Sequence, residues 1–146
     1  VQMLASHDRI VAIKEAVGRM ERIETLCGLC GEGFVVLSGD DNSFLEAMRH
    51  GARGVISVAA NVVPHTFKTM CMAASRHDWA VAEKEEATLR GLFDLLMIES
   101  NPIPVKWALH EMSLCSPQVR LPLTPLSAAY RKALSLCLAD LGAVNL

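Results

Sequence analysis

The sequence predicts an α/β fold in which three parallel strands alternate with helices and a helical region follows. Three apolar runs, RIVAIK (9–14), GFVVLSG (33–39) and GVISVAA (54–60), are rich in Val and Ile and nearly continuous. Such runs are typical of strands that are buried on both faces of a parallel sheet. Helical patterns separate the runs and fill the rest of the chain. We therefore expect a sheet-bearing part over residues 1–76 and a helical region over 77–146.

Two helices are predicted between the strands, RMERIETLC (19–27) and DNSFLEAMRH (41–50), and Gly51 is placed to end the second of them. The order β-α-β-α-β favours a parallel sheet with right-handed crossovers. One face of these strands is expected to point inward, away from the helices. We expect the residues of that inner face to be Val11, Ile13, Val35, Leu37, Val55 and Ser57.

Four further helices are predicted downstream. The first covers 62–76, and Asp78 is placed to cap the start of the second. Asn101 is placed to cap the third helix, whose prolines suit a first turn, and Gly142 ends the fourth. Apolar stripes at helical spacing mark the buried faces of the last three. The stripes are Leu89, Leu92, Phe93 and Leu96, then Val105, Ala108, Leu109 and Met112, and finally Tyr130, Leu134, Cys137 and Leu141.

Composition excludes two classes of partner. The 146 residues carry a net charge of −2 without a basic patch, so nucleic acid is not expected. The apolar fraction is 51%, yet no apolar run approaches the roughly 18 residues that cross a bilayer. We expect the excess apolar surface to be covered by protein, including protein outside this chain. The start VQMLASHD, which lacks an initiator Met and a signal-peptide pattern, also indicates a partial chain.

Five cysteines, an odd number, are scattered along the chain. Cys27 and Cys30 form a C-x-x-C pair, which is either a redox motif or two buried, reduced thiols at the end of an amphipathic helix; we favour the latter. Reduced thiols indicate a cytoplasmic protein. The histidines show no ligand spacing, so a metal is not expected. They are His7, His50, His65, His77 and His110.

Polar or small residues follow each predicted strand. Lys14 and Glu15 come after the first, the GDD sequence 39–41 after the second, and Ser57 and Asn61 after the third. In a (β/α)₈ barrel the chemistry lies at this carboxyl end of the strands. A barrel typically needs about 250 residues. The three strands therefore form either a small open sheet or the last part of a barrel.

A lysine at the inner end of a barrel strand has a chemical use. Desolvation lowers the pKa of such a lysine, and the neutral amine attacks a carbonyl to form a Schiff base. The protonated imine acidifies the adjacent carbon, which then forms an enamine. Arg does not serve here because it stays charged. The alternative for Lys14 is a side chain that extends from the strand end into water.

Four segments, taken in order, resemble one family closely. They are IVAIKEAVG, LSGDD, GARGVISVAANV and NPIPVKWAL. Together they resemble the carboxyl half of the dihydrodipicolinate synthase family, class I pyruvate aldolases related to N-acetylneuraminate lyase. The resemblance covers nearly the whole chain, and the GDD and NPIPVK sequences favour the synthases over the lyases. It implies the last three β/α units, strands six to eight, of a TIM barrel followed by a helical extension.

The resemblance also implies an activity and a site. Lys14 would form the imine with pyruvate, while Gly39 and the backbone around Ile56 would line the pyruvate pocket. The enamine would condense with aspartate semialdehyde on the way to diaminopimelate and lysine, without a cofactor. The family's Thr-Thr pair, tyrosine relay and semialdehyde-binding arginine would all lie upstream of residue 1. Tyr130, the only tyrosine, cannot be assigned the relay role.

Several alternatives stay open at this point. Asp40 and Asp41 are either paired acids or helix-capping residues, and Glu15 either tunes Lys14 or satisfies nearby backbone. Trp107 is expected to pack between helices. The substrate could instead be another 2-oxo-acid aldol, such as sialic acid or a 2-keto-3-deoxy sugar acid, or the chain could be a non-catalytic half-barrel module. For the enzyme, the resemblance implies a homotetramer, and the upstream half-barrel or other copies of the chain are the expected partners. The 146 residues alone are expected to be inactive and not to form a stable monomer.

Overall fold

The structure, a computed structural model, describes residues 1–31 and 33–144. The chain divides into two compact units. We name them the strand unit, residues 1–57 and 68–83, and the helical unit, residues 58–67 and 84–146. Residue 32 and residues 145–146, the last two of the predicted helical region, lie outside the described residues.

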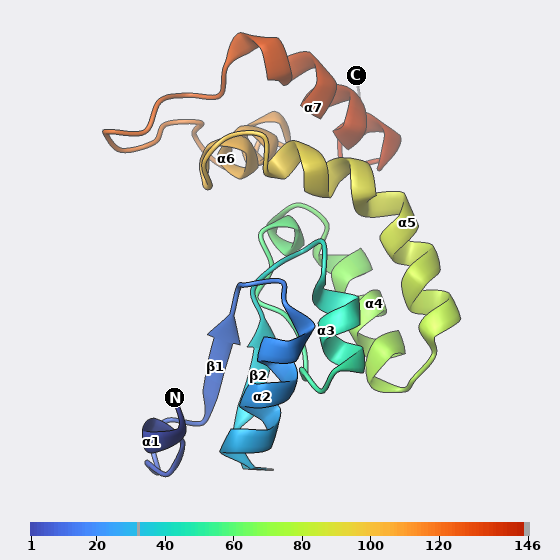
Figure 1. The fold of residues 1–146 in the computed structure, drawn as a ribbon. Helices are drawn as coiled ribbons and strands as arrows, with labels where there is room; N and C mark the ends of the chain where they lie inside the picture. The colour runs from blue at the N-terminus through green and yellow to red at the C-terminus, as the bar shows by residue number, and fades with distance from the viewer. Residues whose placement is uncertain (32, 145–146) are drawn as a thin grey trace. The chain divides into compact units, whose positions relative to one another are not determined.

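The sheet of the strand unit contains two parallel strands, which lie side by side in Figure 1. β1 (Ala12–Glu15) pairs with β2 (Val35–Ser38) so that Lys14 stands opposite Leu37 and Glu15 opposite Ser38. The first two predicted strands and their parallel pairing are therefore confirmed, although both strands are shorter than the apolar runs.

The third predicted strand, 54–60, is wrong over most of its length. Only Val55 forms a parallel bridge, with Ser38 as its partner. The Ser38 N–H donates to the Gly54 carbonyl and the Ile56 N–H donates to the Ser38 carbonyl, both at 2.9 Å. Beyond this point Val58 has helical dihedral angles and the chain turns into the 3₁₀ helix η1 (Ala59–Asn61). Alanine favours helical backbone, so the Ala-Ala pair ends the extended segment.

Two helices cover the sheet within the strand unit. α2 (Met20–Cys30) and α3 (Phe44–Arg49) match the two predicted connecting helices, and a short helix α1 (Gln2–Ala5) precedes the sheet. His50 is the C-cap of α3, and Gly51 follows it with a φ of 105°, as a helix end requires. The core on this side comprises Ile23, Leu26, Val36, Ala47 and Ala52, with Ile13, Met20 and Cys27 packed against it.

This core corrects the predicted inner face of β1. Ile13 packs against the helix-side cluster, so it does not point inward. Side chains alternate along a strand, and Lys14 therefore occupies the opposite face from Ile13 and Glu15. The continuous apolar run 10–13 contains no alternation that could have revealed which residues face the helices.

Two longer helices follow, α4 (Pro64–Ser75) and α5 (Trp79–Leu96). The Val81 N–H donates to Asp78 Oδ1 at 3.3 Å, which confirms Asp78 as a cap for α5. The predicted stripe on α5 is confirmed as well. Its four members are each at most 1% exposed and comprise Leu89, Leu92, Phe93 and Leu96.

The helical unit contains α6 (Ile103–Glu111) and α7 (Ala128–Asp140), whereas α4 and α5 each have residues in both units. The prediction that Asn101 caps α6 is wrong, because Pro102 is the N-cap and no side chain caps the helix. In α6, Val105 and Ala108 are buried, while Leu109 and Met112 are half-buried. In α7, Leu134 and Leu138 are buried, whereas Tyr130, Cys137 and Leu141 are half-buried. Gly142, with a φ of 67°, follows the end of α7 as predicted.

Across residues 1–31 and 33–144, no helix combines the length and the apolarity that crossing a membrane requires.

Candidate functional site

Lys14 lies on β1, one residue before its carboxyl end. Leu37 of β2 stands opposite Lys14 in the pairing. The Lys14 side chain is exposed on the face of β1 that points away from α2. The desolvation expected for a reactive lysine is therefore not provided by the described residues of this chain. The strand nonetheless points the lysine away from the packed core, where its amine is accessible to a ligand.

Gly39 follows β2 directly and lies against Lys14. The Gly39 N–H donates to the Glu15 carbonyl at 2.8 Å, which ties it to the end of β1. A Cβ added to Gly39 would lie 2.5 Å from Lys14 Cε and 2.9 Å from the Ala16 Cβ. Those separations are too short for non-bonded carbon atoms, so a side chain at position 39 would displace the end of the Lys14 side chain and press on Ala16. The structure thus brings together two of the predicted site residues.

Ile56, the third predicted site residue, sits beside the end of β2. Its N–H donates to the Ser38 carbonyl at 2.9 Å, one residue before Gly39. The Ile56 side chain is 49% exposed. Three chain segments that are separate in the sequence therefore meet at one end of the parallel pairing, as the sequence predicted for its strand ends.

Glu15 anchors this strand end from the opposite face. Its side chain is buried, with the residue 8% exposed. Oε2 accepts a 2.8 Å hydrogen bond from Arg22 Nε, and Oε1 accepts one from the Val17 N–H at 3.1 Å. The hydrogen bond from Arg22 is the main cause that lowers the pKa of the Glu15 carboxyl. Of the two interpretations, the geometry favours Glu15 as a structural anchor.

Arg22 is a residue that the sequence reasoning missed. It stands in the first turn of α2, seven positions after Glu15, and no local periodicity links a strand residue to a helix residue at that distance. The available signal was weaker: an acid that ends a buried strand needs a cationic or backbone donor close by.

Asp40 and Asp41 lie just before α3. Asp40 Oδ2 accepts a 2.5 Å hydrogen bond from Ser43 Oγ, and Asp41 is buried. Ser43 is the N-cap residue of α3, and its own side chain makes no capping hydrogen bond. Asp40 is bound to the Ser43 hydroxyl, and capping of α3 by the two aspartates stays a prediction.

The cysteine pair differs from the prediction. Cys27 and Cys30 are free thiols, as favoured, but they are half-buried, not buried. Partial burial is the main cause that raises the pKa of the Cys27 thiol, which disfavours the reactive thiolate. Among the residues that the structure describes, no three His, Cys, Asp or Glu side chains gather as a metal site requires.

The two aromatic residues considered from the sequence both belong to the helical unit. Tyr130 is half-buried on α7. Trp107 packs within the helical unit, with the Arg131 guanidinium 4.6 Å from the centroid of its ring and the His110 ring 5.8 Å away. That environment agrees with the expected packing role of Trp107.

Comparison with known proteins gives one consistent result. A sequence model described as the dihydrodipicolinate synthetase family matches residues 1–141. A 4-hydroxy-tetrahydrodipicolinate synthase of Methylococcus capsulatus is 49% identical over 142 residues, which are 97% of this chain and 49% of that protein. A protein of the same name from Shewanella frigidimarina is 47% identical over 131 residues, which are 89% of this chain and 45% of that protein.

Solved structures agree with this result. Dihydrodipicolinate synthase from Aquifex aeolicus superimposes with a TM-score of 0.93 at 42% identity, over 97% of this chain and 49% of that one. The chloride-inhibited enzyme from Acinetobacter baumannii, complexed with pyruvate, gives a TM-score of 0.91 at 42% identity, over 98% and 49% of the two chains. The chain thus spans about half the length of the relatives it matches. On the family match over residues 1–141, the chain belongs to the dihydrodipicolinate synthetase family.

Proposed function

We propose that this chain is the lysine-bearing half of a Schiff-base lyase that condenses pyruvate with aspartate semialdehyde. Residues 1–76 would supply strands six to eight of a TIM barrel, and residues 77–146 its helical extension. The observation that carries the proposal is the contact of Lys14 with Gly39 at the strand ends, beside Ile56. It is supported by relatives named 4-hydroxy-tetrahydrodipicolinate synthase and by the pyruvate complex of the Acinetobacter baumannii enzyme.

The chemistry begins at Lys14 Nζ. The neutral amine attacks the C2 carbonyl carbon of pyruvate, and loss of water gives a protonated imine. The positive nitrogen withdraws electrons, so a proton leaves C3 and an enamine forms. C3 of the enamine then attacks the aldehyde carbon of the semialdehyde, and its oxygen takes up a proton. Addition of one water molecule to the imine carbon C2 breaks the C2–N bond, which releases the product as a 2-ketoacid and returns the amine of Lys14.

The residues around Lys14 define how pyruvate would be held. The absence of a side chain at Gly39 leaves room for the end of the Lys14 side chain, so pyruvate joined to that lysine would lie next to the Gly39 backbone. The exposed Ile56 would supply an apolar wall for the pyruvate methyl group. Glu15 and Arg22 would hold the end of β1 in place from the helix side through their 2.8 Å hydrogen bond.

The proposal includes elements that this chain does not itself provide. The exposed fractions of Val11 (63%), Val17 (50%) and Ile56 (49%) leave apolar surface around the strands in contact with water. We propose that an upstream half-barrel, or other copies of the chain, covers this surface and desolvates Lys14, with a tetramer as the full assembly. Without that partner the 146 residues should be inactive and should not persist as a monomer. The free thiols support a cytoplasmic location.

Borohydride trapping tests the assignment of Lys14. The assembled protein is incubated with pyruvate and sodium borohydride, and its peptides are mapped by mass spectrometry. A carboxyethyl adduct on Lys14 is expected, and Lys14→Arg should abolish it because Arg stays charged. The matched control is Lys68→Arg, an exposed lysine that should leave the adduct unchanged. An adduct on Lys68 or another lysine in the wild type would overturn the assignment.

Turnover tests the second substrate. With aspartate semialdehyde the protein, assembled with the partner that covers its strands, should consume pyruvate and release a condensation product, whereas N-acetylneuraminate should yield no pyruvate. The protein could instead form the adduct, leave the semialdehyde unchanged and cleave a sugar acid. That result would show that the substrate is the sugar acid, while the imine mechanism at Lys14 would still hold.

A further inference from the structure

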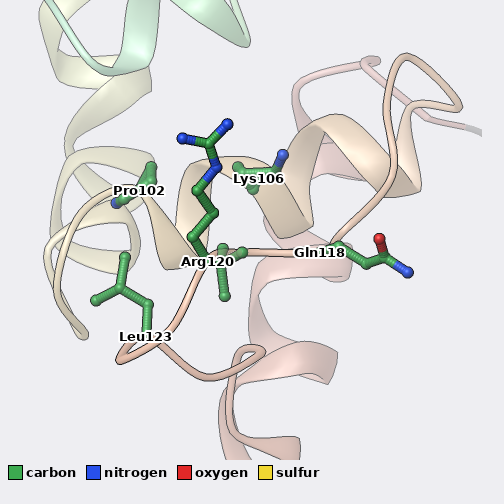
Figure 2. Close-up of a pocket in the computed structure, with 6 residues that line it drawn as sticks. Pro102, Lys106, Gln118, Arg120 and Leu123 are labelled. Carbon is green, nitrogen blue, oxygen red and sulfur yellow. The ribbon is translucent and has the colours of Figure 1, made fainter.

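A cavity of about 450 Å³ lies within the helical unit, between α6 and the loop that leads to α7. Figure 2 shows its lining: Pro102 and Lys106 from the start of α6, and Gln118, Arg120 and Leu123 from the loop, with Val119 as the sixth residue. The volume falls within the range of pockets that hold small organic ligands, roughly 300–1,000 Å³.

The charge of this cavity is one-sided. Two of its six lining residues are cationic and none is acidic. Lys106 is half-buried. In Figure 2 the Arg120 side chain leaves its loop and extends between the side chains of Pro102 and Lys106. Among the residues that the structure describes, neither cation has an ion-pair partner, in contrast to Arg22, Arg49 and Arg90. Two unpaired cations beside one cavity favour an anion.

The rest of the lining is apolar. Pro102, Val119 and Leu123 contribute carbon surface, and all three are half-buried. Inorganic anions gain nothing from such contacts, whereas a carboxylate on a short carbon body buries apolar area against them. We propose that this cavity binds a small organic carboxylate, with Lys106 and Arg120 as its charge partners.

Local hydrogen bonds fix the backbone segments that carry the two cations before any ligand arrives. The Lys106 N–H donates to the Pro102 carbonyl at 3.0 Å within the first turn of α6, so both residues share one rigid segment. In the loop, the Leu123 N–H donates to the Arg120 carbonyl at 3.0 Å and the Gln118 N–H donates to Ser116 Oγ at 3.3 Å. A site that is ordered in advance loses less conformational entropy on binding.

Succinate is a suitable probe because it has two carboxylates and no ketone, so it cannot form an imine with Lys14. The protein, in the assembly it adopts, is titrated with succinate at low salt, and binding is followed by calorimetry and by the amide signals of Val119. Lys106→Gln and Arg120→Gln should each raise the Kd by about tenfold, as the loss of one charge-assisted hydrogen bond predicts. Addition of 0.1 M salt should weaken binding through screening.

Three comparisons make the result decisive. Lys132→Gln, an exposed lysine on α7, and Lys14→Ala should both leave the Kd for succinate unchanged, which separates this site from the imine chemistry. Arg120→Lys keeps the charge and should retain part of the affinity. Inorganic phosphate should bind more weakly than succinate, and Leu123→Ala should weaken succinate but not phosphate. Binding that Lys106→Gln and Arg120→Gln leave unchanged, or phosphate binding equal to that of succinate, would overturn the proposal.

Discussion

Helix α5 of the helical unit and strand β1 of the strand unit are stabilised in different ways. In the helical unit, α5 buries four large apolar side chains to 1% exposure or less, and Phe93 stacks on Phe67 with a centroid distance of 5.8 Å. In the strand unit, β1 buries no apolar side chain, and its one buried residue is Glu15. That strand is held by its hydrogen bonds to β2 and by the Glu15–Arg22 ion pair.

The difference shows how a reactive strand can be fixed on one side only. Apolar packing on both faces would bury Lys14 under side chains and close the space beside Gly39. A polar anchor on the helix face leaves the opposite face of β1 accessible. The two tryptophans report on the two units separately, since Trp79 belongs to the strand unit and Trp107 to the helical unit. Unfolding is best compared at one protein concentration, because association shifts apparent stability.

The largest effect is expected in the helical unit. Phe93→Ala removes a ring that is 1% exposed and should lower the free energy of unfolding by about 3–5 kcal/mol. The loss of unfolding free energy is measured by urea unfolding, followed through Trp107 fluorescence in a Trp79→Phe background. The control, Leu136→Ala on α7, removes a side chain that is 48% exposed and should cost far less. Equal costs for the two variants would show that the helical unit is not stabilised by this apolar core.

A smaller effect is expected at the polar anchor. Glu15→Gln removes the charge that accepts hydrogen bonds from Arg22 and Val17 and should cost about 1–3 kcal/mol. Folding lowers the pKa of Glu15. The stabilisation by the Glu15 carboxylate is therefore complete at a pH above the usual glutamate pKa of about 4.3, and it is lost as the pH falls through the pKa of the folded state. Wild type and variant should therefore converge in strongly acidic urea melts. The exposed Glu21→Gln serves as control, and a difference from wild type that does not change with pH would contradict the ion-pair account.

A second pH effect has the opposite sign. His50 Nδ1 lies 2.6 Å from Glu24 of α2 and Nε2 lies 3.1 Å from Glu46 of α3, and these hydrogen bonds raise its pKa. The stabilisation of the fold by protonated His50 is fully present at a pH below the usual histidine pKa of about 6.5, and it is lost as the pH rises through the pKa of the folded state. The wild-type melting temperature should fall across that window, while His50→Gln should flatten the profile. A proton NMR titration that places the imidazole pKa below 6.5 would contradict this assignment.

The smallest expected effect is a gain in the free energy of unfolding. Gly91 lies inside α5, and an added Cβ would meet nothing within 4 Å. Gly91→Ala should therefore stabilise the protein by up to about 1 kcal/mol through helix propensity alone. Gly28→Ala, in an equally open position on α2, should give a similar gain in the strand unit. A large loss at either site would reveal packing that the described residues do not account for.

Local patterns explain which predictions succeeded. The stripe on α5 and the cap at Asp78 depend on neighbours within a few residues, so the sequence alone contains them. The third strand failed because its length depends on pairing with β2 and on the turn at Ala59, which a run of apolar residues does not encode. The Glu15–Arg22 pair and the joint placement of Lys106 and Arg120 required three-dimensional information, since each joins a residue of one segment to a residue of another.

The contact between Lys14 and Gly39 has a consequence for how the family can diverge. Positions 14 and 39 compete for the same space, because Lys14 Cε would lie only 2.5 Å from a Cβ at position 39. A larger residue at position 39 would displace the flexible end of the Lys14 side chain, and it would also press on Ala16, whose Cβ would lie 2.9 Å away. Loss of the lysine alone therefore does not make room for a side chain at position 39. Across homologous chains, a residue larger than glycine at position 39 should be accompanied by changes at both position 14 and position 16.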